Sequence, residues 1–438
     1  MLNPPKAVGV EFPLRGCTVV FDDGVRQVAL ISLDLVGLVP STVAEIRAAA
    51  TIGTELTPTD VMITCSHTHR APFVTPGMDY DADFEYLDWL RDRLVIGLRD
   101  AWAARQPARL RVGRADAPGW TFNRRQIYRT DLGEQVGTQG PEWVDNFVRR
   151  EGPEDNELKI LVAEGLQGDV LGGLVNFACH PTVMGAEPVY SADFCGPLVD
   201  ELARRHGGCF AFLQGAAGNL WSIDMSTPAG MSNRGSDYAH RMAQALADKA
   251  GEALASARAV AGDTVRMARE VLRVPQRRPT PKQVELAKWY LEEAPDEIDE
   301  AEFTRRMRGR AFTFYHPGSD VQRWFAREAI GMWEWQRRAG TREMLDDVEI
   351  QAIAVGDVAF VGYPAEYFTE FGLRTKAESP FEDTFVLELT NGWHGYVPTQ
   401  EAFANGGYET RFALSSRLIS EAGDAMCDTG VELLRRLA

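Results

Sequence analysis

Two histidines, His67 and His69, stand one residue apart behind a short apolar run in the stretch ITCSHTHRAP at residues 63–72. If this run is a β-strand, residues i and i+2 project from the same face, so the two imidazoles would point the same way. Paired imidazoles at the end of a buried strand are one way to begin a zinc site. A capped strand end with exposed histidines explains the same pair equally well. The pair alone therefore leaves both interpretations open.

A third histidine, His180, also follows an apolar run, in NFACHPT, and Pro181 behind it prevents that strand from continuing. A single histidine beside an apolar run is more often a hydrogen-bonded core residue than a metal ligand. Taken together with His67, however, His180 is better explained as a second ligand. Three other histidines lack a strand-end setting and lie in a helix-ending turn, on a polar helix and in a His-Pro-Gly loop: His206, His240 and His316.

A carboxylate and one further donor would complete such a site. Glu366 follows a strand pattern and a proline in FVGYPAEYF, and a Gly-rich turn in LTNGWHGYVPTQEAF contains His394 and Tyr396. By residue type alone, Glu366 is an ordinary helix-start acid that the helix dipole favours, and Tyr396 is an ordinary amphipathic turn residue. Local spacing does not decide between these interpretations.

The elements that would position these side chains alternate between strand and helix. Residues 17–35 contain two β-rich runs around Asp-Asp-Gly, which is typical of a hairpin. A Ser/Thr-capped helical pattern follows at 40–56, and a strand pattern returns at 60–69. This order of strand, helix and strand predicts an α/β fold with mixed β-sheets flanked by helices.

The same order recurs in the middle of the chain. A strand pattern at 168–181 ends in His-Pro, an amphipathic helix pattern at 196–208 is closed by glycines, and a strand at 209–222 has a Gly-rich exit. Strand ends are where α/β proteins usually place their sites. We therefore expect the candidate residues to meet at such ends.

We predict a single domain over residues 1–438, with a helical excursion at about 276–345 that is rich in Arg, Glu and Trp. Strand patterns resume at 347–368, which is why the excursion is assigned to the same domain. Amphipathic helices that cover a sheet explain this segment better than a ligand-binding lid. Residues 417–438 form a terminal amphipathic helix pattern.

Composition excludes some classes of partner. The 438 residues include 46 Lys plus Arg and 63 Asp plus Glu, a net charge of −17, which repels phosphate backbones and anionic lipid. We therefore expect no nucleic-acid partner. We also expect no stable membrane insertion and a cytoplasmic protein, because neither a secretory signal nor a run of 18 apolar residues is evident. The six scattered cysteines form no CxxC pair, so we expect buried thiols in a reducing compartment.

Six blocks along the chain together resemble the catalytic domain of the neutral (non-lysosomal, alkaline) ceramidases. In order they are CSHTHRAP, NRRQIY, NFACHPT with SADFCG, FLQGAAGN, YPAE, and NGWHGYVPTQEAF with GGYE. They match family blocks of the form SHTHSGPGG, NRSPxAY, FxxHPT, QxxxGDVSPN, PGE and NxYxxYVTT. The resemblance runs from about residue 8 to about residue 420. It implies a ceramidase-like fold and zinc-dependent hydrolysis of an amide (N-acyl) bond.

The resemblance also implies a role for individual residues. It assigns four zinc ligands: His67, His180, Glu366 and Tyr396. It places His69 beside the metal as a proton-transfer or oxyanion group. Tyr408 would help to hold the developing oxyanion, and Arg124 corresponds to the arginine of the NRSP block.

The serine block departs from the family pattern. Where the family has GDVSPN with its proposed nucleophilic serine, this chain has GNLWSID, so Trp221 stands at the serine and Ser222 is one position late. A shift of one residue in an extended chain turns a side chain to the opposite face. Either the loop is re-registered so that Ser222 serves, or zinc-bound water or hydroxide attacks directly. We favour the water, with His69 taking its proton.

Two further departures concern the substrate. Arg70 and Phe73 replace small residues beside the metal, and with Trp221 we expect them to contact the substrate. We also expect no C-terminal β-sandwich domain, because the sequence stops about thirty residues after GGYE. Both features favour a small N-acyl substrate over a long-chain sphingolipid. The oligomeric state stays open, and a homo-oligomer is one alternative.

Two other functions explain parts of the sequence. An HxH pair also opens the metal site of barrel-type amidohydrolases, which act on esters or lactones among other bonds, but a bridging lysine and a second strand-end histidine are not evident. Alternatively, Trp221 in place of the serine marks a catalytically lapsed, zinc-containing binding protein. A set of four retained ligands argues against the second alternative.

Overall fold

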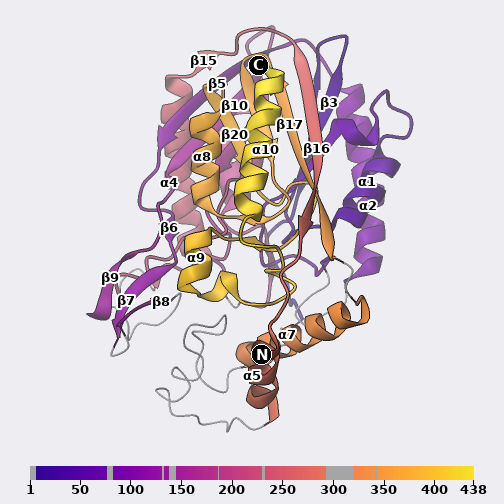
Figure 1. Cartoon of the computed structure of the whole chain (residues 1–438). Coiled ribbons are helices and arrows are strands. Elements are labelled where there is room, and N and C mark those ends of the chain that lie inside the picture. The colour runs from indigo at the N-terminus through magenta and orange to yellow at the C-terminus, as the bar shows by residue number, and fades with distance from the viewer. Residues whose placement is uncertain are drawn as a thin grey trace.

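The computed structural model describes residues 6–75, 82–130, 133–137, 145–185, 187–228, 232–292, 320–340 and 343–438. Three sheets form the framework of these residues (Figure 1). The first sheet contains, in spatial order, β2 (Gly16–Asp22), β3 (Gln27–Leu33) and β4 (Val61–Cys65). The second contains β13 (Cys209–Gln214), β11 (Val170–Phe177), β10 (Glu157–Gly165), β5 (Ala108–Asp116) and β15 (Arg258–Ala259). The third contains β16 (Val265–Pro275), β17 (Leu345–Val355), β18 (Val358–Gly362) and β20 (Asp383–Leu387).

Smaller sheets surround this framework. They pair β1 (Val10–Phe12) with β12 (Tyr190–Ser191), β6 (Phe122–Asn123) with β14 (Leu220–Trp221), β19 (Glu366–Tyr367) with β21 (Tyr396–Val397), and β7 (Gln126–Thr130) with both β8 (Gly133–Gly137) and β9 (Phe147–Arg150). Two of these pairs, β6–β14 and β19–β21, contain or adjoin residues of the predicted site.

The framework sheets are mixed, as predicted. The hairpin of β2 and β3 is antiparallel, whereas β3 and β4 are parallel and are connected through α1 (Pro40–Ala50). In the second sheet β11 and β13 are likewise parallel, with α3 (Cys195–His206) between them in the chain. No sheet of the described residues has more than five strands, so they contain no eight-stranded parallel barrel. This result argues against a barrel-type amidohydrolase.

The three framework sheets share one central core, to which each contributes one face. Because strand residues alternate between faces, a framework strand can divide its side chains between this core and an outer layer. In β18, for example, Val358 and Phe360 face the centre, whereas Ala359 and Val361 face outward. The central cluster comprises Phe21, Val28, Leu30, Met62, Val112, Leu161, Leu174, Ala211, Leu213, Val265, Ile353, Val355, Val358, Phe360, Phe385 and Leu387.

Helices cover the outer face of each framework sheet (Figure 1). The first sheet packs against α1 and α2 (Phe84–Ala103), the second against α3 and α4 (Ser236–Ala255), and the third against α8 (Thr369–Glu378) and α10 (Ala422–Leu437). α10 confirms the predicted terminal helix. Among the described helices, none is both long and apolar enough to cross a bilayer.

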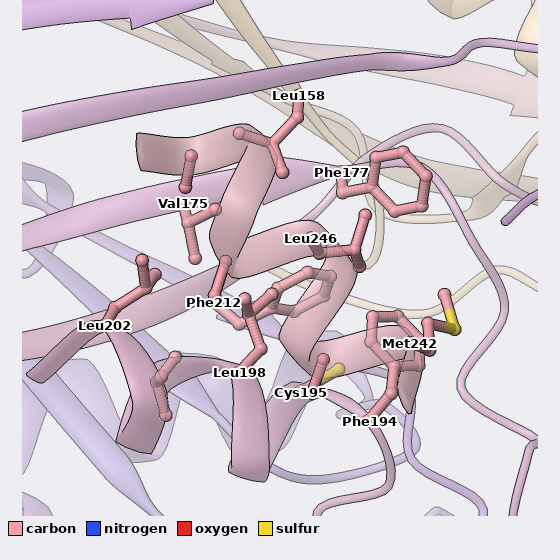
Figure 2. Packing of buried hydrophobic residues seen from close by; sticks show 14 of the residues in the cluster. Leu158, Val175, Phe177, Phe194, Cys195, Leu198, Leu202, Phe212, Met242 and Leu246 are labelled. Carbon is pink, nitrogen blue, oxygen red and sulfur yellow. The ribbon is translucent and has the colours of Figure 1, made fainter. Parts of the chain in front are cut away.

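The layer between α3, α4 and the second sheet shows how an outer core is built. Figure 2 shows Val175, Phe177 and Phe212 from the strands pointing toward Leu198 and Leu202 of α3 and Met242 and Leu246 of α4. Burying one such side chain stabilises the folded state by about 1.5–3 kcal/mol. The sheet carrying His180 is therefore anchored from its outer side.

The predicted helical excursion is present where the structure describes it. Its helices α5 (Pro281–Glu292) and α7 (Asp320–Arg338) pack together around Tyr290 and Phe325, while residues 293–319 lie outside the described residues. α7 also reaches the predicted site, because the ring of Phe325 lies 5.7 Å from that of Tyr408.

A substitution of Gly113, which lies in β5, tests how α4 packs on the second sheet. A Cβ atom at Gly113 would lie 2.1 Å from the carbonyl oxygen of Ala253 in α4, whereas one at Gly251, in the same helix, would meet no atom within 4 Å. We expect Gly113→Ala to lower the free energy of unfolding by about 1–3 kcal/mol through overpacking. Gly251→Ala should raise it by up to about 1 kcal/mol, because alanine favours a helix. Denaturant unfolding measures both, and equal midpoints for the two variants would contradict the described packing.

Candidate metal centre

Three of the predicted ligands come from the carboxyl ends of strands in three different sheets. His67 follows β4 by two residues, and His180 follows β11 by three. Glu366 lies in the short strand β19, four residues after β18 ends at Gly362. Each framework sheet thus contributes one side chain, in line with the usual placement of sites in α/β proteins.

The local geometry of His67 differs from the predicted strand. β4 ends at Cys65, so His67 and His69 lie outside it, and His67 has a positive φ of 71°. Alternation along a strand is therefore the wrong reason for their common direction. A left-handed conformation is costly for histidine and persists only where the surroundings hold it. Here the backbone N–H of His67 donates to the carbonyl of Leu35 at 2.9 Å.

The side-chain donor atoms nevertheless converge. Nε2 of His67 lies 2.9 Å from Nε2 of His180 and 3.3 Å from Nε2 of His69. Oε2 of Glu366 lies 3.4 Å from the His67 nitrogen and 3.7 Å from the His180 nitrogen. Ligand atoms around a tetrahedral zinc ion, each about 2.0–2.1 Å from it, lie roughly 3.3 Å apart. The separations in this cluster are close to that value.

The opposite nitrogens of two of these histidines are tied to the backbone. Nδ1 of His67 lies 2.6 Å from the carbonyl oxygen of Val36, and Nδ1 of His180 lies 3.2 Å from that of Ala217. Because a carbonyl oxygen only accepts, each Nδ1 carries a hydrogen, so Nε2 of each ring is left to hold a proton or to bind a cation. Burial acts to lower the pKa of His67, but Glu366 outweighs it and raises that pKa. Two lone pairs 2.9 Å apart repel unless a proton or a cation lies between them.

Glu366 supplies negative charge at the same point. Its Oε1 accepts a hydrogen bond of 3.0 Å from the indole nitrogen of Trp393, whereas its buried Oε2 has no hydrogen-bond partner among the described residues. Burial would raise the pKa of Glu366, but His67, Tyr396 and Trp393 outweigh it and lower the pKa to about 2. An ionised, buried carboxylate is costly unless a positive charge satisfies it, and a proton on His67 or a metal cation would supply that charge here. Carboxylate and imidazole donors together fit a zinc ion.

His69 differs from the other two histidines because its side chain is exposed. The ring nitrogen that meets His67 is partly buried, so desolvation and the neighbouring His67 lower the pKa of His69 to about 3 although the residue as a whole is exposed. Desolvation also lowers the pKa of His180, so both rings are neutral near pH 7. A neutral imidazole on the accessible side can accept a proton from a group that approaches from solvent.

Tyr396, Arg124 and Tyr408 lie together beside Glu366. Parallel pairing of β19 with β21 sets Tyr396 opposite Glu366, and the ring of Tyr408 lies 5.6 Å from that of Tyr396. The guanidinium carbon of Arg124 is 5.4 Å from the Tyr396 ring and 5.8 Å from the Tyr408 ring. Burial acts to lower the pKa of Arg124, but Tyr396 and Glu409 outweigh it, so Arg124 stays charged.

Trp221 ends β14, and Ser222 follows directly after this strand. Trp221 of β14 pairs with Phe122 of β6, and β6 is the strand directly before Arg124 in the chain. Ser222 is completely buried, and its Oγ has no hydrogen-bond partner within the described part of the chain. Its role as a nucleophile stays a prediction.

Arg70 and Phe73, the predicted substrate contacts, follow the histidine pair and are both half-buried. The carbonyl oxygen of Arg70 accepts a hydrogen bond from the backbone N–H of Ser191 at 2.8 Å. Desolvation lowers the pKa of Arg70, and the nearby carboxyl groups of Asp193 and Glu187 oppose that shift. These two acids therefore compensate part of the Arg70 charge.

Comparison with known proteins supports the fold. No family model matches the chain, and no curated protein sequence does either. Among solved structures, the chain is similar to neutral ceramidase from Pseudomonas aeruginosa, with a TM-score of 0.68, and to a ceramidase complexed with C2, with a TM-score of 0.69. Both are 17% identical in sequence, and the alignments cover 100% of this chain and 70% and 71% of theirs. The chain has the ceramidase fold. The predicted fold class is thereby confirmed.

Within this ceramidase fold, a tight loop before β14 packs on the backbone of Glu366. The N–H of Gly218 donates to the carbonyl of Tyr367 at 2.9 Å, and the side chain of Arg124 donates to the carbonyl of Gly218 at 2.8 Å. A Cβ atom at Gly218 would lie 2.4 Å from the carbonyl oxygen of Glu366. Only glycine permits this approach, which explains a glycine of the FLQGAAGN block.

Glu388 is a positioning residue that the sequence analysis missed. It follows β20, is fully buried, and its Oε2 accepts hydrogen bonds from the N–H groups of Ala217 at 3.0 Å and Tyr367 at 2.9 Å. The carbonyl of Ala217 holds His180, and Tyr367 is covalently joined to Glu366. One carboxyl group thus connects the segments behind two candidate ligands. A single acid within the apolar run FVLELT was the available signal.

Replacing Glu388 tests this connection. Glu388→Ala would leave two buried N–H groups without an acceptor, and we expect it to lower the free energy of unfolding by about 2–5 kcal/mol. Glu388→Gln keeps one acceptor oxygen and should stay within about 1 kcal/mol of the wild type. Denaturant unfolding distinguishes them. Equal losses for both variants would show that the two hydrogen bonds do not account for the effect.

Proposed function

We propose that this protein is a zinc-dependent hydrolase that cleaves the amide (N-acyl) bond of a small substrate. One observation carries the proposal: Nε2 of His67 and Nε2 of His180 converge with a buried oxygen of Glu366 that has no hydrogen-bond partner among the described residues. Two imidazoles and one carboxylate form a donor set typical of catalytic zinc. The ceramidase fold adds support, because ceramide is itself an N-acyl amide.

His67, His180 and Glu366 would hold the zinc ion, with Tyr396 as the fourth protein ligand that the family resemblance implies. Tyr396 is placed for this role by its pairing with Glu366 in β19 and β21. A bound zinc ion lowers the pKa of a coordinated water to about 7 and polarises a carbonyl group.

His69 is suited to move the proton. Its ring lies on the accessible side of the cluster, and from this position it can take a proton from the attacking water and deliver it to the leaving amine. Its Nε2 lies 3.3 Å from that of His67, so its reactive nitrogen faces the centre rather than bulk solvent.

Arg124 and Tyr408 are suited to stabilise the oxyanion of the tetrahedral intermediate. Glu409 accepts a hydrogen bond from Nε of Arg124 at 2.8 Å and thereby fixes the guanidinium beside the two tyrosine rings. A fixed positive charge stabilises developing negative charge without reorganisation during the reaction.

The same arrangement would accept esters and lactones, because attack on their carbonyl groups needs the same three functions. The amide is favoured by the ceramidase fold alone. A small substrate is favoured by the half-buried Arg70 and Phe73, which stand where the family blocks have small residues. A panel of N-acyl amides, esters and lactones tested with zinc-loaded protein ranks these classes. Tight binding without turnover of any would instead favour a binding protein.

The metal ligands are tested by replacing His67 or His180 with Ala. Each change removes a nitrogen donor, so we expect bound zinc to fall from about one ion per chain to near zero, and hydrolysis of the best panel substrate to disappear with it. Metal analysis and initial rates measure both. His240→Ala, at an exposed histidine on α4, is the matched control and should keep both properties. Full activity of metal-free wild-type protein would refute the proposal.

Ser222→Ala tests whether the nucleophile is a serine or a water molecule, and Tyr408→Phe tests the proposed oxyanion donor. If water attacks, Ser222→Ala should change kcat by less than about tenfold, whereas loss of a nucleophilic serine costs on the order of 10⁴-fold or more. Tyr408→Phe removes an oxyanion donor and should lower kcat by about 10²–10³-fold. Steady-state kinetics on variants whose zinc content is unchanged distinguishes the two nucleophiles. A loss of kcat of about 10⁴-fold in Ser222→Ala would show that Ser222 is the nucleophile.

A further inference from the structure

Two cysteines from different sheets meet away from the metal centre. Cys17 lies in β2 and Cys209 begins β13, 192 positions later, and their Sγ atoms are 3.3 Å apart. Cys17 is half-buried and Cys209 is exposed, whereas Cys65, Cys179, Cys195 and Cys427 are buried. The prediction of buried thiols is therefore wrong for Cys209.

Only a small movement of the two sulfur atoms would be needed for them to form a disulfide bond. A disulfide has an S–S distance of about 2.05 Å, so the sulfur atoms need to approach by roughly 1.2 Å. Cys209 follows Gly207 and Gly208, which have φ values of 80° and 70° in the turn after α3. Glycine backbone tolerates small adjustments more readily than any other residue. This turn can therefore absorb the approach.

The surroundings also divide the two thiols into an attacking and a resolving partner. Cys209 is accessible to a small reagent, whereas the thiol of Cys17 points at Cys209 and at the carbonyl oxygen of Phe210, 3.7 Å away. The hydrogen bond from Cys17 and the charge of Arg15 lower the pKa of Cys209. An accessible thiol with a lowered pKa is the one that reacts first.

We propose that Cys17 and Cys209 are a reversible modification site that closes to a disulfide by exchange with a small-molecule disulfide such as oxidised glutathione. The Cys209 thiolate attacks one glutathione sulfur and releases one glutathione thiolate, which gives a mixed disulfide. The Cys17 thiolate then attacks the sulfur of Cys209 and releases the second. The protein dithiol loses two electrons and two protons, and oxidised glutathione is reduced to two thiols.

This bond would link two framework sheets covalently. β2 belongs to the sheet whose strand β4 leads to His67, and β13 belongs to the sheet whose strand β11 leads to His180. The bond would therefore tie together the sheets from which two candidate ligands extend. The inference depends only on the contact between the thiols and does not require the proposed hydrolase activity.

The test uses the full-length protein, equilibrated with oxidised glutathione under native conditions and then quenched in acid. We expect intact mass to show the loss of two hydrogens, and peptide mapping without reductant to show one peptide pair joined through Cys17 and Cys209. Dithiothreitol should reverse both changes. The four buried cysteines are the internal control and should stay free.

Single variants report the order of the two steps. Cys17→Ser lacks the resolving thiol and should accumulate one glutathionyl group on Cys209. Cys209→Ser lacks the attacking thiol and should remain largely unmodified. Wild-type protein that stops at the glutathionyl adduct, or that forms no Cys17–Cys209 peptide pair at all, would overturn the proposal.

Discussion

The approach of two imidazole nitrogens and one carboxylate oxygen at a buried point is the constraint on which this structure depends. Nε2 of His67 and Nε2 of His180 lie 2.9 Å apart, and a buried oxygen of Glu366 without a hydrogen-bond partner lies 3.4 Å from the first. Such a cluster of lone pairs and negative charge is unfavourable by itself. A proton on His67 or a bound metal cation would make the same geometry favourable, so the fold holds these side chains where a positive charge satisfies them.

Rigid backbone keeps these atoms in place. Each of the two histidines is oriented by a carbonyl group, and Glu388 binds the N–H groups of Ala217 and Tyr367 behind two of the three donors. Gly218 lets its loop rest directly on the backbone of Glu366. The central core of three sheets then fixes the strand ends relative to one another. Positioning therefore comes from contacts among segments far apart in the chain.

Much of the fold was predictable because its signals are local. The Asp-Asp-Gly hairpin, the helix after it and the terminal helix follow from turn chemistry and apolar periodicity, and all three are present. The ligand candidates His67, His180 and Glu366 were identified from ordered motifs, and the structure brings them together. Details failed where tertiary contacts override local preference. His67 leaves the expected strand because its N–H bonds to Leu35, and Cys209 is exposed although an apolar strand follows it.

The sequence by itself determined which residue types are available, the order of strands and helices, and the resemblance whose fold the structure bears out. Tertiary structure alone decided that one side chain from each framework sheet reaches the same point, that Glu388 supports two of them, and that Cys17 meets Cys209 across 192 positions. The physical reason is the separation along the chain over which each kind of interaction acts. Turn and periodicity signals act over a few residues, whereas these contacts depend on how three separately formed sheets pack against one core.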